Sequence, residues 1–299
     1  MTAAARTCVA AIFATALAVT LAGAVYVVPG HQGSAAREVM PNTARNGYPM
    51  VPAALPRGAA AAQVSNITSA GSLNWAGYAV SKASTTFTAV QATFFVPYLD
   101  CAQSPGKSLS SAWVGLDGFV GHPESVEQGG IGADCSAAGK ASYFAWYEMY
   151  PAAEARAAVT VAAGDSVTAA VSYDPADQEF KITLTDNTRG GHFAVRRKCP
   201  HVKADGKFIT CPRNSAEVIT EAPASGSGKH LVIAHLADYG AVSFAAVTVT
   251  DAAGASGGIV SSHWTATKII QLTSSSGATV ARPTPTQASM FDNYWLRED

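Results

Sequence analysis

The chain has 299 residues, of which 48% are hydrophobic and only 14% are charged, which excludes an intrinsically disordered chain and allows a sizeable core. Its net charge of −1 argues against nucleic acid as the main partner. The charge is uneven, because four basic residues and one acidic residue precede residue 71, which leaves 16 basic and 20 acidic residues in the remainder.

The N-terminus has the pattern of an export signal. Arg6 supplies a positive start, Val9–Leu21 is an apolar run, and the small residues of Ala22–Ala24 fit a cleavage site. We therefore expect a signal peptide over residues 1–24 and a secreted protein that is not attached to a membrane after cleavage. An uncleaved anchor is the alternative, because Val25–Val28 prolongs the apolar run.

Residues 25–71 are rich in Ala, Pro, Gly and Ser and show little periodicity, which is typical of a linker or a propeptide. A basic propeptide would be held on an acidic body by charge near neutral pH, and protonation of the acids at low pH would loosen it. This N-terminal segment is thus an expected partner of the mature protein.

Beyond this segment the pattern is almost entirely that of β-strands. Apolar and polar residues alternate in Val90–Val96, Val167–Tyr173 and Val242–Val249, and turn residues separate such runs. A spacing of about 8–14 residues predicts an all-β sandwich of two antiparallel, jelly-roll-like sheets with about a dozen strands or more. We assign this domain to residues 72–282, and residues 283–299 to a C-terminal tail or an added edge strand.

Five cysteines are present, and Cys8 would leave with the signal. The remaining four indicate two disulfides in an exported chain, for which three pairings exist. We favour Cys101–Cys135 and Cys199–Cys211, because both loops are short. The chain has no Cys-x-x-Cys pair and its histidines are scattered, so we expect no metal site and no cofactor.

A serine nucleophile is the first chemistry to consider. Gly254–Gly258 reads Gly-Ala-Ser-Gly-Gly and formally matches the Gly-x-Ser-x-Gly motif. That motif works at a strained turn from a strand into a helix. Because no helix pattern follows here, we interpret the stretch as a hairpin turn.

The remaining candidates for chemistry are carboxyl and amide groups on strands beside aromatic residues or glycines. Glu217 and Glu221 share one strand face, because their positions differ by an even number. Periodicity alone chooses neither between these two acids nor between the neighbours Glu127 and Gln128. The candidates are Asp117, Glu127, Gln128, Glu148, Glu217 and Glu221.

Five short segments together resemble the glutamic peptidases, the eqolisin family of secreted acid proteinases. They occur in the family's order and span most of the expected mature chain. Each segment alone is a weak signal, whereas five in order are fairly specific. The segments are Asn74–Tyr78, Trp113–Gly118, Glu127–Gly129, Trp146–Pro151 and Ser215–Glu221.

The resemblance implies a β-sandwich of two seven-stranded antiparallel sheets, with a catalytic Gln and Glu on neighbouring strands. By motif position this pair is Gln128 and Glu217. The aromatic residues Trp146 and Phe144 are expected in the ordinary sandwich core. The supporting and substrate-binding residues that the resemblance implies are Trp75, Trp113, Asp117, Glu148 and Tyr150.

The chemistry of such a pair needs neither a serine nor a metal. A carboxyl group can take a proton from water and later pass one to the leaving amine. The Gln N–H can donate to the oxygen that becomes negative in the tetrahedral intermediate. A Glu base, with an ordinary pKa of about 4.3, works best at acid pH. We therefore expect a monomeric acid endopeptidase that cleaves extended or denatured chains, in which Glu217 begins either as base or as acid.

Two positions depart from the family's pattern, which often has Trp at the position of Met149 and Trp after the catalytic Glu, where this chain has Val218. We expect both replacements to trim aromatic surface near the cleft. Cleavage preference would then change, while the catalytic groups stay in place.

Two other functions fit the same pattern. A secreted carbohydrate-binding, lectin-like sandwich would hold sugars on the Trp and Tyr side chains. A two-carboxylate glycosidase would use Glu148 and Glu217. Loss of proteolysis in Glu217→Gln with an intact fold would support the peptidase, whereas polysaccharide breakdown without peptide hydrolysis would identify the glycosidase.

Overall fold

The computed structural model describes residues 67–104, 106–121, 124–200, 208–225, 232–273, 275–287 and 289–297. Strands and their connecting loops make up these ranges. Within them there is no helix long and apolar enough to cross a membrane. The strands are β1 (Ile67–Ser72), β2 (Trp75–Ser81), β3 (Phe87–Phe95), β4 (Ser108–Leu116), β5 (Val126–Cys135), β6 (Ala141–Tyr150), β7 (Ala155–Arg156), β8 (Ser166–Asp174), β9 (Glu179–Asp186), β10 (His192–Lys198), β11 (Ser215–Glu221), β12 (Ala224–Ser225), β13 (Val232–Ile233), β14 (Ala241–Asp251), β15 (Ser256–Gly257), β16 (Thr265–Leu272), β17 (Thr279–Pro283) and β18 (Phe291–Trp295).

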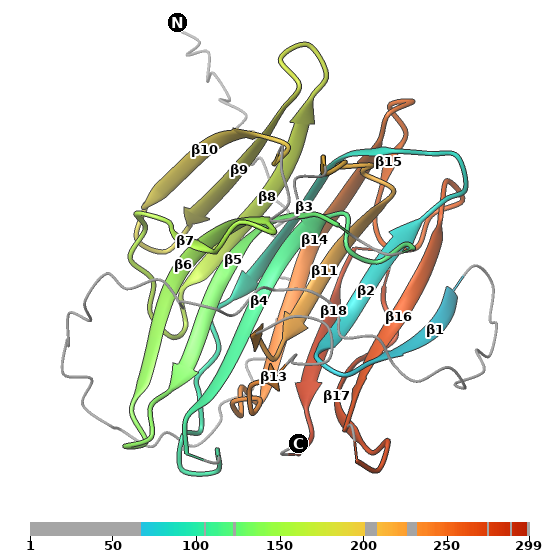
Figure 1. Ribbon diagram of the computed structural model, residues 1–299. Helices are drawn as coiled ribbons and strands as arrows, with labels where there is room; N and C mark the ends of the chain where they lie inside the picture. The colour runs from blue at the N-terminus through green and yellow to red at the C-terminus, as the bar shows by residue number, and fades with distance from the viewer. Residues whose placement is uncertain are drawn as a thin grey trace, which may run out of the picture. The chain divides into compact units, whose positions relative to one another are not determined.

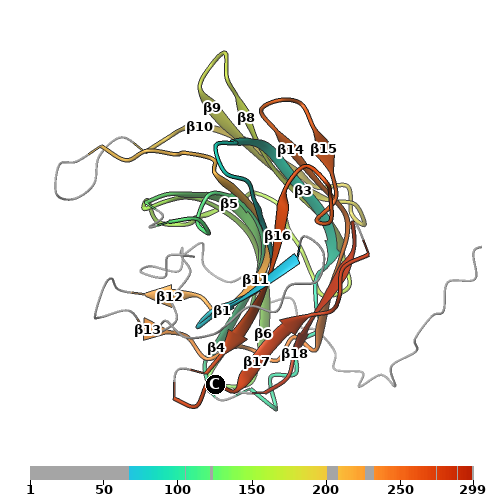
Figure 2. The same cartoon turned by 90° about the vertical axis from the view of Figure 1, so that its right-hand side faces the viewer.

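One 16-stranded sheet dominates the fold (Figure 1). Its main path runs β10-β9-β8-β3-β14-β18-β17-β16-β2-β11-β4-β5-β6-β7, with β1 beside β16 and β15 beside β14. The neighbours along the path are antiparallel, whereas β1 pairs with β16 in parallel. The strands bend strongly along their length (Figure 2). The short hairpin of β12 and β13 forms a separate sheet.

The main core lies between the two halves of this path. Inward side chains of β3, β8, β9 and β14 come from one half, and those of β4, β5 and β11 come from the other. Phe94 and Phe180 belong to the first group, and Leu116 and Val218 to the second. Because both halves contribute to one apolar cluster, the sheet packs on itself as a sandwich, which confirms the predicted all-β sandwich fold.

Both predicted disulfides are present. Cys101 is bonded to Cys135, and Cys199 to Cys211. The first joins a loop after β3 to the end of β5, and the second joins the segment after β10 to the segment that leads into β11. The predicted hairpin at Gly254–Gly258 is also confirmed, because Ser256 and Gly257 pair antiparallel with β14.

The ends of the domain differ from the expected boundaries. The predicted signal over residues 1–24 lies outside the described residues, as does residue range 25–66 of the predicted propeptide or linker. Its last residues, 67–71, belong to β1, so strand structure begins before residue 72. Near the other end, β18 lies between β14 and β17 and therefore forms neither a loose tail nor an edge strand. Its Phe291 stacks on Phe244 of the core, which explains why this late segment is held inside the sheet.

Candidate active site

A polar row crosses four neighbouring strands. Glu217 of β11 lies opposite Gly115 of β4, Gly115 lies opposite Gln128 of β5, and Gln128 lies opposite Glu148 of β6. Residues that oppose each other directly in a sheet point to the same face. The predicted catalytic pair and one supporting acid therefore share one face, and the Cα atoms of Gln128 and Glu217 lie two strand spacings, or roughly 10 Å, apart.

Gly115 keeps the space between the two catalytic candidates open. A Cβ atom at this position would lie 3.1 Å from the Cβ of Gln128 and 3.0 Å from the Trp113 ring. Both distances are shorter than ordinary van der Waals contacts. The glycine on the central strand thus leaves a gap in the row into which the side chains of Gln128 and Glu217 can reach.

Gln128 is held by its neighbour in the row. Its Nε2 donates to Oε2 of Glu148 at 2.7 Å, and both side chains are buried. An amide that donates to a buried carboxylate has a fixed orientation, because the reversed amide would present its oxygen to the carboxylate. Glu148 therefore orients the amide of Gln128.

Glu217 is a buried acid without such support. Its side chain is unexposed, and neither carboxyl oxygen has a hydrogen-bond partner at normal geometry among the residues that the structure describes. Burial raises the pKa of Glu217 well above its ordinary value of 4.5, the Ser215 hydroxyl opposes the shift, and the charge of Asp117 adds to it. Burial thus favours the neutral, protonated form of Glu217.

Glu221 lies on the same face of β11 but in different surroundings. Asn74 Nδ2 donates to its Oε1 at 2.8 Å, and Trp113 Nε1 donates to its Oε2 at 2.9 Å. These bonds hold the Trp113 ring and join β11 to β4 and to the residue before β2. The structure thus separates the two acids that periodicity left equivalent, because Glu221 accepts two side-chain hydrogen bonds and Glu217 does not.

Asp117 lies just after β4 and fastens the start of β11. Its carboxylate accepts hydrogen bonds from the backbone N–H of Arg213 at 2.7 Å and of Asn214 at 2.9 Å. Its own N–H donates to the Ser215 carbonyl at 3.1 Å. Burial raises the pKa of Asp117, and these two carboxylate hydrogen bonds oppose the shift. Asp117 thus ties the end of β4 to the segment that leads into β11.

A second apolar cluster lies on the same face as the row. Trp75 and Trp113 meet edge to face with ring centroids 4.8 Å apart, and both are unexposed. Trp146 belongs to this cluster, and Phe144 and Tyr150 pack against it. Trp146 is thus buried in a core cluster, but this cluster lies with Glu148 on the opposite face of β6 from the main core.

The expectation for Val218 and Met149 was wrong. Both side chains belong to the sandwich core, because each lies one residue from a member of the row and therefore points to the other face of the sheet. Neither replacement trims aromatic surface beside Gln128 and Glu217.

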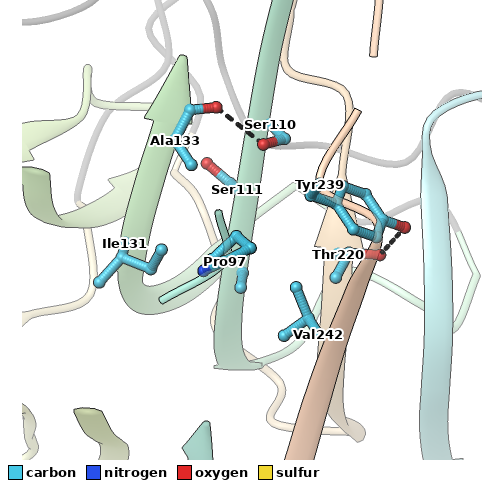
Figure 3. Close-up of a pocket in the computed structure, with 9 residues that line it drawn as sticks. Pro97, Ser110, Ser111, Ile131, Ala133, Thr220, Tyr239 and Val242 are labelled. Atoms are coloured by element: carbon cyan, nitrogen blue, oxygen red, sulfur yellow. Dashed lines mark hydrogen bonds between the residues drawn. The ribbon is translucent and has the colours of Figure 1, made fainter. Parts of the chain in front are cut away.

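Two cavities border these strands. The one in Figure 3 lies on the core side of β4, β5 and β11 and is too narrow for a water molecule. Tyr239 and Thr220 are hydrogen-bonded at its edge, and Ser110 donates to the Ala133 carbonyl. The second cavity, of about 200 Å³, is lined by Asp117, Ser125 and Asn214 among others. This second cavity thus lies beside Asp117, and none of the residues that line it belongs to the row.

The positions of the acids can be compared with those needed for a two-carboxylate glycosidase or for a metal site. Glu148 and Glu217 lie three strand spacings apart, or roughly 14 Å between Cα atoms, and Gln128 lies between them. Because Glu148 accepts a hydrogen bond from Gln128, the neighbour that Glu148 engages in the row is an amide and not the second carboxyl group. Across the described ranges, no three His, Cys, Asp or Glu side chains gather as metal ligands.

Comparisons with known proteins agree with this geometry. The model of the peptidase A4 family matches residues 73–291. The crystal structure of scytalido-glutamic peptidase with a transition state analog inhibitor is similar, with 25% identity, a TM-score of 0.59, and coverage of 75% of this chain and 98% of that one. SCP-B, an eqolisin solved in a complex with the tripeptide Ala-Ile-His, shares the fold at 23% identity, a TM-score of 0.55 and the same coverage.

A comparison with curated proteins gives no significant match. The family match nevertheless covers well over half of the chain and includes all four strands of the polar row. The chain therefore belongs to the peptidase A4 family, the eqolisins, and is a glutamic-type endopeptidase.

Proposed function

We propose that this chain is a secreted acid endopeptidase in which Gln128 and Glu217 hydrolyse the peptide bond by activating and orienting a water molecule. The observation that carries the proposal is the shared row: the two side chains stand on one face, separated by a single strand whose facing residue is Gly115. A water molecule and a peptide carbonyl could occupy the gap that the glycine leaves.

Glu217 would move the protons. General acid–base help of this kind accelerates a reaction by about 10²–10⁴-fold. Because burial is the largest cause of its raised pKa, entry of water and substrate would bring the pKa of Glu217 back toward its ordinary value. The same carboxyl group could then act as base toward the water and as acid toward the leaving amine at acid pH.

Gln128 would stabilise the oxyanion. Its amide carries two N–H donors, one of which bonds to Glu148 and fixes the amide plane. We expect the other to donate to the carbonyl oxygen of a bound substrate as that oxygen becomes negative. One such donor contributes on the order of 3 kcal/mol to transition-state stabilisation.

The full-length chain would be an inactive precursor. Gln128 and Glu217 both have no solvent-exposed surface, so a peptide cannot reach them until the site opens. The basic segment before residue 71 has the opposite charge to the acidic body and would be released when low pH neutralises the acids. Incubation of the purified precursor at pH 3–4 tests this, and a chain that stays unprocessed and inactive would contradict it.

The catalytic assignment is tested by digestion of a denatured protein between pH 2 and pH 7 with pepstatin present. We expect cleavage by the wild type at acid pH, and resistance to pepstatin, which suits two-aspartate sites. Gln128→Ala and Glu217→Ala should each lose most of this activity. Glu179→Gln is the matched control, because Glu179 is a partly exposed acid on β9 that pairs with Arg196. Cleavage that survives in Glu217→Ala would overturn the assignment.

A further inference from the structure

Glu127 is a buried acid for which the proposed mechanism has no use. It lies opposite Leu116 of β4 and Met149 of β6, and both of these side chains belong to the sandwich core. Strand alternation therefore points Glu127 into the core, on the opposite face from its neighbour Gln128. Its side chain is unexposed, and its carboxyl group lies within hydrogen-bond reach of the Asp117 carboxyl and of the Ser125 side chain.

The groups around Glu127 come from three neighbouring elements. Asp117 follows Leu116 at the end of β4, and Glu217 comes from β11. Arg213 adds a positive charge next to Asp117, and its guanidinium lies 3.7 Å from the centroid of the Tyr173 ring of β8. Burial raises the pKa of Glu127 well above its ordinary value, the charges of Asp117 and Glu217 add to this, and Ser125 opposes it.

This environment assigns different charge states to the two carboxyl groups. Asp117 accepts two backbone N–H hydrogen bonds, which favour its ionised form. Glu127 has an apolar residue on each side in the ladder, which favours its neutral form. Of the two, Glu127 is thus the carboxylic acid and Asp117 is the carboxylate.

Asp117 holds a backbone conformation that needs support. Asp117 and Arg213 both have positive φ, at 67° and 51°, a backbone region that is unfavourable for a non-glycine residue. The hydrogen bond between them fixes the turn two residues before Ser215, where β11 begins. Loss of this contact would free the start of the strand that carries Glu217.

We propose that Glu127 is a positioning residue of the site: as a neutral carboxylic acid it supports Asp117, and through Asp117 it fixes the start of β11 and the position of Glu217. The proposal rests on the proposed function of Glu217. A second negative charge at Glu127 would lie in the apolar core beside Asp117 and would repel it. Raising the pH would therefore release β11 and disassemble the site.

Two substitutions of Glu127 distinguish a residue that positions Asp117 from one that only fills the core. In Glu127→Gln the amide N–H replaces the carboxyl O–H as a donor to Asp117, so we expect cleavage at pH 4 within about threefold of the wild type. Glu127→Leu suits the apolar core but has no donor, and we expect at least about a tenfold loss at pH 4, because small displacements of catalytic groups are costly. Wild-type activity in Glu127→Leu, with Glu179→Gln as the neutral control, would overturn the proposal.

The pH at which the enzyme is inactivated provides a second test of the role of Glu127. Each enzyme is incubated between pH 5 and pH 9 and then assayed at pH 4, so that the charge of Glu217 during the assay stays constant. We expect the inactivation midpoint of Glu127→Gln to rise by about one pH unit or more, because the ionisable group is gone. An unchanged midpoint would contradict the proposal.

Thermal unfolding tests whether Glu127 and Asp117 are coupled without an activity assay. In the Gln128→Ala background, where self-cleavage should not intervene, Tm is compared at pH 4 and pH 7 for Glu127→Gln, Asp117→Asn and the double variant. We expect non-additive shifts at pH 7, because the two groups act as a unit, whereas additive shifts would show that Glu127 does not act through Asp117. If the wild type cleaves no peptide, the proposed function fails, and the unfolding series still decides whether the two residues are coupled.

Discussion

Two regions of β11 carry the same side chain on the same face and differ in everything around it. At one end, Glu221 accepts hydrogen bonds from Asn74 and Trp113. In the middle, Glu217 is equally buried but has no such donors at normal geometry in the described part of the chain. The strand supplies both with identical backbone support, so their difference comes from the facing residues of neighbouring strands.

The difference shows how one sheet can make one acid structural and another reactive. Hydrogen-bond donors favour the ionised form of a carboxyl group and hold it in one position, whereas burial without donors favours the neutral form. Glu221 opposes Trp75 and Ser111, and Glu217 opposes Ala79 and Gly115. Small facing residues thus leave Glu217 room and a proton, which are the requirements of an acid–base catalyst.

The largest effect that separates the two acids should be on activity. Glu217→Gln should lower peptide cleavage about 10²–10⁴-fold, because an amide cannot exchange a proton. Glu221→Gln keeps an acceptor oxygen for Asn74 or Trp113, and we expect cleavage at pH 4 within about tenfold of the wild type. Initial rates on a denatured protein substrate measure both. Equal losses in the two variants would remove the distinction.

For stability, a substitution at Glu221 should have a larger effect than one at Glu217. Glu221→Leu leaves the donors of Asn74 and Trp113 unpaired in a buried site, which should cost about 2–5 kcal/mol of unfolding free energy. Glu217→Leu removes a buried acid that is supported by the Ser215 side chain but not by two donors as Glu221 is, so its cost should be the smaller of the two. Urea unfolding at pH 4 compares the two, with Gln128→Ala as the common background. A larger loss in Glu217→Leu would mean that its carboxyl has a structural partner.

The free energy of unfolding should also depend on pH through the ionisation of Glu217. Below its ordinary pKa of 4.5, Glu217 is protonated in both the folded and the unfolded chain, so it contributes no slope. Above that value the unfolded chain loses the proton while the folded chain keeps it, so stability falls as pH rises, by at most about 1.4 kcal/mol per pH unit. Adding Glu217→Gln to Gln128→Ala should make this fall less steep between pH 5 and pH 7, while Glu127, whose pKa burial also raises, keeps its own share of it. An unchanged slope would show that Glu217 ionises normally in the folded chain.

The smallest expected effect on stability is that of removing one hydrogen-bond donor to Glu221. Trp113→Phe keeps most of the ring in the cluster with Trp75 but removes the N–H that bonds to Glu221. We expect a loss of about 1–2 kcal/mol in unfolding free energy and little change in the pH slope assigned to Glu217. Thermal unfolding across the same pH range checks both points. A loss well above this range would mean that the ring itself, and not its N–H, carries the stability.

The sequence predicted the elements of the fold well because their signals are local. Alternating apolar residues predicted the strands, and short loops between cysteines predicted both disulfides, which the structure confirms. The tail after residue 283 carried no such signal, since β18 is kept in the sheet by its pairing with β14 and β17. That pairing joins segments far apart in the chain, so local pattern could not reveal it.

The candidate site was predicted less completely than the fold. Family motifs pointed to Gln128 and Glu217, and the structure places them in one row. Strand alternation alone is enough to place Val218 on the opposite face of β11 from Glu217. Glu127 could be recognised as a buried acid only after its ladder partners, Leu116 and Met149, were known.

By itself, then, the sequence determined a chain of amphipathic strands, a cysteine framework and an inventory of acids, amides and aromatic rings, because these follow from residue type and a period of two. Only the tertiary structure decided which acid acquires donors, which stays neutral, and which amide faces Glu217 across Gly115. The physical reason is strand register. If β5 or β11 shifted by one residue against β4, Gln128 or Glu217 would point to the other face of the sheet and the row would be broken. The register in turn depends on contacts between residues that are distant in the chain.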